Sequence, residues 1–132
     1  MQAGLREFAM VFAAGGTGAA LRVWLGAMVD ARLGDRLASV GTLSANLLGC
    51  LLIGLCSVAL TTPVARMVVM GGFLGGFTTY SAFALFSVEF VAGSKWETLA
   101  AQLGLHLVGG MLCAYGGIQL ARAIGLGGPQ VS

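Results

Sequence analysis

Four long stretches without charged side chains dominate this chain of 132 residues and constrain its fold more than any other feature. Each is 22 to 29 residues long: residues 8–29, interrupted only by Arg22, 37–65, 67–88 and 98–121. About 20 apolar residues in a helix cross the hydrocarbon core of a bilayer. Such a helix satisfies its own backbone hydrogen bonds, which lipid cannot do. The sequence therefore predicts four transmembrane helices.

Composition supports a membrane location and excludes a water-soluble globule. Hydrophobic residues make up 58% of the chain, charged residues make up 9%, and the mean hydropathy is +0.93. An ordinary soluble domain carries about 25% charged residues. No basic cluster indicates nucleic-acid binding. Three cysteines fall within predicted helices without paired spacing and are interpreted as packing residues: Cys50, Cys56 and Cys113.

The predicted fold class is all-α, with one transmembrane domain over residues 1–132. The helices are expected at roughly residues 5–29, 37–60, 66–92 and 98–121. Many of the 22 glycines fall inside them. Small residues four apart, such as Gly72 and Gly76, let helices in lipid approach closely. Because four short helices enclose little space alone, any transport function predicts an oligomer.

Basic residues in the predicted loops are balanced between the two sides of the membrane. Three lie on the side of the N-terminus, Arg6, Arg66 and Arg122, and three lie on the other side, Arg32, Arg36 and Lys95. An excess of Lys and Arg normally sets the orientation of a membrane protein. A chain without an excess can insert both ways, which predicts dual topology and an antiparallel homodimer. The alternative is that such small counts balance by chance.

Polar side chains inside the predicted helices indicate an anion path. Most of them are hydrogen-bond donors, which can replace the water around an anion. Asn46 and Thr42, four residues apart, share one face of the second helix. Ordinary interhelical hydrogen bonding, at about 0.6–2 kcal/mol per contact, is the alternative. The polar residues do not include a nucleophile grouped with a base and a residue that orients the base, so no enzyme activity is predicted.

The third predicted helix carries glycines, threonines and aromatic residues in mid-membrane, from Gly71 to Phe83. This run predicts a helix break, whose free carbonyls can bind a cation. Beyond the break, Tyr80 and Phe83 share a helical face. Aromatic rings have positive edges that can help replace the hydration of a small anion. Simple packing of the two rings is the alternative.

The fourth predicted helix carries His106, the one histidine of the chain, four residues after Gln102. Two interpretations stay open for it. The ring either hydrogen-bonds a neighbouring helix as a neutral imidazole or lines the pore, where its protonated form adds a donor and a charge.

Three motifs, in order, resemble the Fluc (CrcB) fluoride channel family. They are GGTGAALR at 15–22, GTLSANLLG at 41–49 and GGFLGGFTTYSAF at 71–83. With four spans, the resemblance covers essentially the whole chain. It implies a passive, fluoride-selective channel in the bacterial plasma (inner) membrane, exporting cytoplasmic fluoride. It also implies an antiparallel homodimer in membrane lipid, with two pores.

The resemblance also implies roles for particular residues. Asn46 would be the pore amide donor, and Tyr80 and Phe83 the two ring positions. The remaining roles would fall to Thr42, Ser81, Gln102 and His106 as further pore residues, to Arg22 near a vestibule, and to the carbonyls of Gly75 and Thr78 as ligands of a structural sodium ion.

The chain departs from the family pattern at several positions. Family members usually have phenylalanine at the position of Tyr80 and glutamate at that of Phe86. Gln102 and His106 replace the usual tyrosine and serine. The main alternative is a small multidrug or guanidinium exporter, which also has four helices. Such exporters depend on a buried glutamate in the first helix, where this chain offers Arg22.

Overall fold

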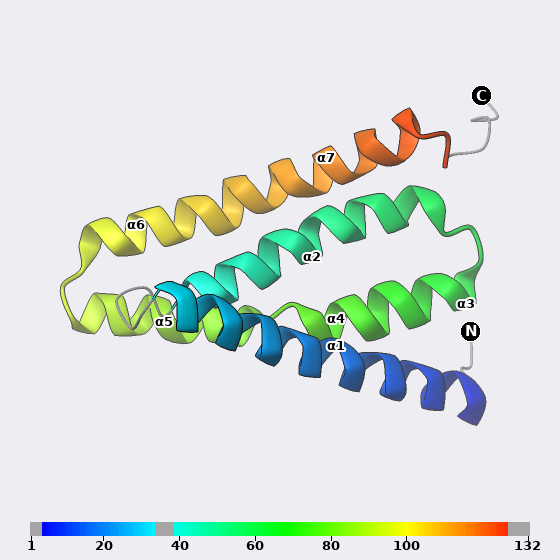
Figure 1. Ribbon diagram of the computed structural model, residues 1–132, viewed down its shortest axis with the longest axis horizontal. Helices are drawn as coiled ribbons and strands as arrows, with labels where there is room; N and C mark the ends of the chain where they lie inside the picture. The colour runs from blue at the N-terminus through cyan, green and yellow to red at the C-terminus, as the bar shows by residue number, and fades with distance from the viewer. Residues whose placement is uncertain (1–3, 34–38, 127–132) are drawn as a thin grey trace.

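The computed structural model describes residues 4–33 and 39–126, and all regular structure in these ranges is helical. The elements, in chain order, are α1 (Leu5–Leu33), α2 (Val40–Ala59), α3 (Pro63–Arg66), the π-helix η2 (Met67–Leu74), α4 (Gly75–Phe77), α5 (Tyr80–Ala92), α6 (Trp96–Gly104), the π-helix η3 (Leu105–Gly109) and α7 (Gly110–Ala123). Figure 1 shows four long segments running back and forth, with both ends of the described chain at the same end of the molecule.

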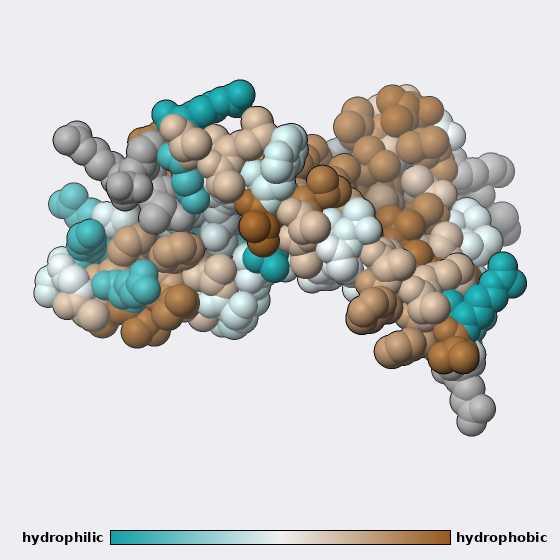
Figure 2. All heavy atoms as spheres, turned by 60° about the horizontal axis from the view of Figure 1, so that its bottom comes forward, coloured by the Kyte–Doolittle hydropathy of each residue, from teal (hydrophilic) through white to brown (hydrophobic). Residues whose placement is uncertain are grey.

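Each of the four segments is long and apolar enough to cross a membrane. The first to fourth segments are Leu5–Leu33, Val40–Ala59, Pro63–Ala92 and Trp96–Ala123, and the most apolar 18 residues of each have a mean hydropathy between 1.3 and 1.9. Strongly hydrophilic residues gather mainly toward the two ends of the elongated molecule in Figure 2. Many large apolar side chains between the ends point outward, as lipid permits. The prediction of an all-helical fold is confirmed for the described residues, and four helices are long and apolar enough to span a membrane.

The helix ends differ from the predicted bounds by up to about one turn. α1 continues to Leu33. The positive charge of Arg32 in its last turn stabilises this end, because the C-terminal end of a helix dipole is negative. The third segment begins at Pro63, because the Thr62 side chain accepts a hydrogen bond from Ala65 N–H at 3.3 Å and proline suits the first turn. The fourth spans Trp96–Ala123. Positions 37 and 38, predicted to start the second helix, lie outside the described residues.

Arg66 links the second and third segments through its side chain. It lies at the end of the molecule where both ends of the described chain are found (Figure 1). Its Nη1 donates to the carbonyls of Ser57 at 3.0 Å and Leu60 at 3.1 Å. These carbonyls lie in the last turn of α2 and just past it, where a helix leaves acceptors without partners. Arg66 therefore serves as a cap for α2 as well as a basic loop residue.

Glycine contacts hold α1 against the third segment. A Cβ added at Gly18 would fall on the carbonyl oxygen of Phe73, and one added at Gly76 would fall on that of Gly15. Helices in lipid gain their association energy from such close backbone contact. The sequence prediction that small residues mark helix contacts therefore holds for Gly76, which meets α1.

A second glycine contact holds α2 against α7. A Cβ at Gly54 would collide with the carbonyl of Ala114, and one at Gly117 with the carbonyl of Leu51. The neighbouring Gly116 differs, since a Cβ there would meet nothing within 4 Å. Gly117 is therefore closely packed against α2, whereas the adjacent Gly116 faces open space.

We predict that Gly117→Ala destabilises the protein by about 1–3 kcal/mol, because overpacking forces α2 and α7 apart. Gly116→Ala is the matched control, since both changes raise helix propensity equally, by about 1 kcal/mol. Thermal unfolding in detergent, followed by size-exclusion chromatography, measures the difference. Equal melting temperatures for the two variants would contradict the close α2–α7 contact.

Candidate functional site

The third segment is interrupted at Thr78 and Thr79, in the middle of the membrane-spanning stretch. Thr78 has φ −91° and ψ 157°, and Thr79 has φ −146° and ψ 113°, so both are extended. The Thr79 side chain then accepts a hydrogen bond from Ala82 N–H at 3.3 Å and caps the start of α5. The run of glycines and threonines therefore produces the helix break expected from the sequence.

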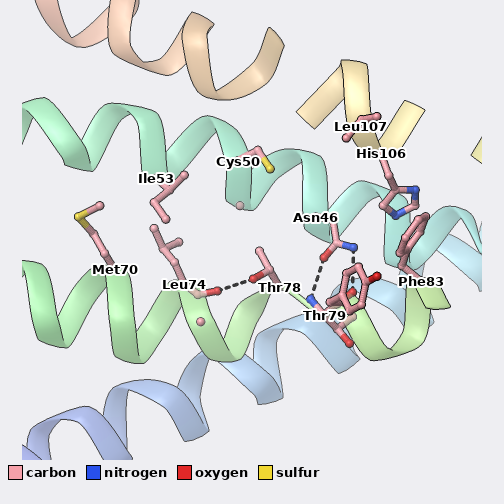
Figure 3. Close-up of a pocket in the computed structure, with 13 residues that line it drawn as sticks. Asn46, Cys50, Ile53, Met70, Leu74, Thr78, Thr79, Phe83, His106 and Leu107 are labelled. Atoms are coloured by element: carbon pink, nitrogen blue, oxygen red, sulfur yellow. Dashed lines mark hydrogen bonds between the residues drawn. The ribbon is translucent and has the colours of Figure 1, made fainter. Parts of the chain in front are cut away.

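Asn46 on α2 holds this break through two hydrogen bonds. Its Nδ2 donates to the Thr79 carbonyl at 3.0 Å, and Thr79 N–H donates to its Oδ1 at 2.8 Å (Figure 3). An amide carries two N–H groups, so one remains for another acceptor. In an uninterrupted α-helix, Thr79 N–H would donate to the carbonyl of Gly75. The Asn46 side chain thus releases that carbonyl.

The close approach of α2 to the break depends on Gly49. A Cβ added there would fall on the Cγ2 methyl group of Thr78. The Thr78 hydroxyl donates to the Leu74 carbonyl at 3.0 Å, so its hydrogen is engaged while its oxygen can still accept. Hydroxyl and backbone carbonyl oxygens are therefore the acceptors at this point, and hard cations prefer oxygen ligands. Among the described residues, no cluster of three His, Cys, Asp or Glu side chains could hold a metal.

The break opens onto a groove of about 410 Å³ between α2, the third segment and η3. Its polar end is formed by Asn46, Thr79 and His106, and its other end by apolar side chains (Figure 3). The lining residues are Asn46, Gly49, Cys50, Ile53, Met70, Leu74, Gly75, Thr78, Thr79, Tyr80, Phe83, His106 and Leu107. Six of the predicted site residues are thus brought together: Asn46, Gly75, Thr78, Tyr80, Phe83 and His106.

Three rings follow one another along the polar end of the groove. The Tyr80 and Phe83 centroids lie 5.6 Å apart with a 50° interplanar angle. Those of Phe83 and His106 lie 4.5 Å apart at 40°. Tyr80 is 79% exposed in the single chain, so its ring needs a neighbour from outside the chain to be covered. All three rings belong to the groove lining and are tilted relative to one another.

Comparison with known proteins agrees with this architecture. Residues 9–118 match the model of the family described as CrcB-like protein, Camphor Resistance (CrcB). The chain belongs to this family. Three relatives, each named fluoride-specific ion channel FluC, illustrate the similarity. They come from Maridesulfovibrio salexigens (31% identity, covering 87% of this chain and 95% of the relative), Aromatoleum aromaticum (37%, 79% and 85%) and Dichelobacter nodosus (38%, 89% and 98%).

Gln102 lies behind the rings of this CrcB-like chain and outside the groove lining. It is only 5% exposed, and its Nε2 donates to the Phe83 carbonyl at 3.2 Å and to the Ser87 hydroxyl at 3.0 Å. The Ser87 hydroxyl donates in turn to the Phe83 carbonyl at 2.8 Å. These bonds tie α6 to α5 at the Phe83 backbone. Sequence reasoning missed Ser87, although a hydroxyl four residues after Phe83 was the available signal.

The other predicted site residues lie around the groove. Arg22 reaches the break from α1, where its Nε donates to the Gly76 carbonyl at 3.2 Å. Ser81 is exposed, with its hydroxyl 3.2 Å from that of Thr79. Thr42 lies on α2 one turn before Asn46 and is outside the groove lining. Two sides of the break are therefore held by polar side chains, one from α1 and one from α2.

We predict that Asn46→Ala speeds hydrogen exchange at the Thr79 amide roughly tenfold or more, because the loss of a buried hydrogen bond costs about 1–3 kcal/mol. Thr42→Ala, one turn earlier on the same helix, is the matched control. Hydrogen–deuterium exchange with mass spectrometry of peptides covering 75–82 measures the effect. Unchanged exchange in Asn46→Ala would show that the pair does not hold the break.

Proposed function

We propose that this chain is a fluoride-specific ion channel that passively exports cytoplasmic fluoride. The observation that carries the proposal is the convergence of an amide side chain, aromatic rings and a helix break on one groove, halfway along the third segment. The relatives that cover most of the chain are named for the same activity. The proposed location is the bacterial inner membrane, which four apolar helices suit.

The proposed ion path replaces the hydration shell of fluoride with fixed donors. Asn46 contributes the N–H that its pairing with Thr79 leaves free, and Tyr80 and Phe83 contribute positive ring edges. Because both amide bonds to Thr79 fix the Asn46 side chain, its free N–H needs little reorganisation to meet an ion. Further pore positions are proposed for Thr42, Ser81, Gln102 and His106, with Gln102 acting through the Phe83 backbone.

Arg22 is proposed to act near a vestibule as an attraction for anions. A charged side chain inside a membrane span is costly and usually serves a pathway or a partner. Only its Nε is engaged with Gly76 by a described hydrogen bond. The guanidinium therefore brings a positive charge close to the break.

We propose that two chains form an antiparallel homodimer with two pores. The groove is open along one side, and Tyr80 on its rim is largely exposed. A second copy placed against this side would convert the open groove into an enclosed path, and surrounding membrane lipids would cover the outer faces. Balanced loop charges support insertion in both orientations.

A structural sodium ion is proposed at the helix break, bound by the carbonyls of Gly75 and Thr78 from each chain. The residues fit this role because Asn46 diverts the N–H that would otherwise occupy the Gly75 carbonyl. Both residues also line the open groove, where a second copy would meet them. A bound cation would supply a fixed positive charge that joins the two chains.

The alternative of a small multidrug or guanidinium exporter is not favoured. Such exporters resemble this chain in size but need a buried carboxylate in the first helix to bind cations. The membrane-spanning part of α1 carries Arg22, which would repel a cationic substrate. The donor-rich groove suits an anion instead.

We predict that purified protein in liposomes releases fluoride, and that Asn46→Ala and Phe83→Ile reduce the rate at least tenfold. Each change removes a group that replaces water around the ion, and one lost donor costs about 1–3 kcal/mol. A fluoride electrode measures the efflux, with cross-linking to verify that each variant remains a dimer. Gly116→Ala, in open space on α7, controls for reconstitution. Parental rates in both pore variants would refute the proposed path.

We predict dual topology from the balanced loops. In a background with the native cysteines replaced, Thr61→Cys and Ser94→Cys place single thiols at opposite ends of the molecule. A membrane-impermeant reagent applied to intact cells should label about half of each, because no charge excess sets the orientation. Labelling of one site only would refute the antiparallel dimer. Two or three lysines added to one loop should bias insertion and lower fluoride efflux.

A further inference from the structure

We propose that His106 couples fluoride occupancy of the groove to protonation, so that conduction at low fluoride rises as pH falls. The inference rests on the proposed function and names a regulation of the same site. Protonated His106 and a fluoride ion in the groove would stabilise each other. The physical basis is the hydrogen bonding of the ring, its burial and its neighbours.

The hydrogen bond of His106 decides which ring nitrogen carries the proton. Its Nδ1 lies 3.0 Å from the backbone carbonyl oxygen of Gln102. A carbonyl oxygen only accepts, so Nδ1 must be the donor. The neutral ring is therefore protonated at Nδ1, and its Nε2 carries a lone pair.

This tautomer leaves the neutral ring with nothing to offer an anion. Its one N–H is engaged by Gln102, and Nε2 is shielded from solvent with no hydrogen-bond partner among the described residues. His106 lines the groove, and a lone pair on its ring disfavours an anion nearby. Protonation at Nε2 replaces the lone pair with an N–H donor and adds a positive charge. The ring then changes from an unfavourable to a favourable neighbour of fluoride.

The described residues that line the groove around His106 offer no other counter-charge, so a fluoride ion would be the partner of the positive charge on the protonated ring. A charge that is removed from water is costly unless a counter-charge accompanies it. None of the described residues lining the groove is an aspartate or glutamate. An anion in the groove would thus supply the missing counter-charge. Since coupling is reciprocal, fluoride binding would favour proton uptake by the same factor.

Phe83 offers a second route for the effect. Its ring centroid is 4.5 Å from that of His106, within the range in which a cation is attracted to an aromatic face. Protonation of His106 would hold the Phe83 ring more firmly and withdraw electron density from its face. The ring edge offered to the groove would then be more positive. Gln102 fixes the Phe83 backbone from behind, so the ring has a rigid base.

The other titratable groups near His106 are not expected to change fluoride conduction between pH 5.5 and 7.5. The groove is shared with the Cys50 thiol of α2 and the Tyr80 phenol of α5. Thiols and phenols ordinarily lose their protons at higher pH than imidazolium does. Cys113 lies seven residues further along the fourth segment, and Glu97 lies nine residues before His106 at the start of α6. Histidine is the side chain that ordinarily titrates between about pH 5 and 8.

Fluoride efflux from liposomes at pH 5.5 and 7.5, at fluoride concentrations well below saturation, tests the proposal. The rate should be several-fold higher at pH 5.5 than at pH 7.5, because protonation of His106 adds a donor and a positive charge beside the groove. Protein-free liposomes correct for leakage of HF through lipid. His106→Ser and His106→Gln should conduct with a pH ratio near one. Cys50→Ser, which changes a groove residue without an assigned role in the ion path, is the matched control and should keep the parental ratio.

Proton uptake provides a readout that does not depend on flux. Addition of sodium fluoride to the dimer in weakly buffered detergent at about pH 6.5 should take up protons, as reported by an indicator dye. Sodium chloride and the His106→Gln variant should give no uptake. Absent uptake, or an equal pH ratio in the parent and both His106 variants, would overturn the inference. Absence of efflux from all proteins would refute the channel, while the dye experiment would still decide whether His106 couples proton and fluoride binding.

Discussion

The double hydrogen bond between the Asn46 carboxamide and the Thr79 backbone underlies the arrangement of the whole groove. It replaces one turn of helical bonding in the third segment and fixes α2 beside the break. Non-helical backbone at membrane depth is tolerated where protein groups or a cavity replace its lost partners, and the Asn46 side chain supplies the partners of Thr79. The position of Tyr80 and Phe83, which begin the next helix, follows from where this pairing ends α4 and starts α5.

Glycine provides the space that this arrangement needs. Gly49 admits the methyl group of Thr78, while Gly18 and Gly76 let α1 approach the segment just before the break. Arg22 then reaches the Gly76 carbonyl from α1, opposite to Asn46. The break is therefore supported from two sides by one polar side chain each, and the glycines bring both supports within reach.

Much of the fold could be predicted from the sequence, because the lengths of uncharged stretches and the run of glycine and threonine act locally. The partner of Asn46 could not, since the backbone of Thr79 has no side-chain signature. The fourth segment shows a second limit. Regular helical spacing places Gln102 and His106 on one stripe, but the π-helix η3 begins between them and shifts the register. His106 lines the groove and contacts the Phe83 ring, while Gln102 is buried and contacts the Phe83 backbone.

The two walls of the groove differ in their freedom to evolve. On the α2 side, one amide shapes the backbone and also lines the groove, so a substitution at Asn46 changes architecture and lining chemistry together. On the η3 side, the side chain of His106 contacts its own helix and one ring, and the break does not depend on it. Residues on that wall can be substituted without loss of the helix break. Substitutions in the fourth segment can therefore change how the groove responds to conditions such as pH, while the broken backbone of the third segment stays the same.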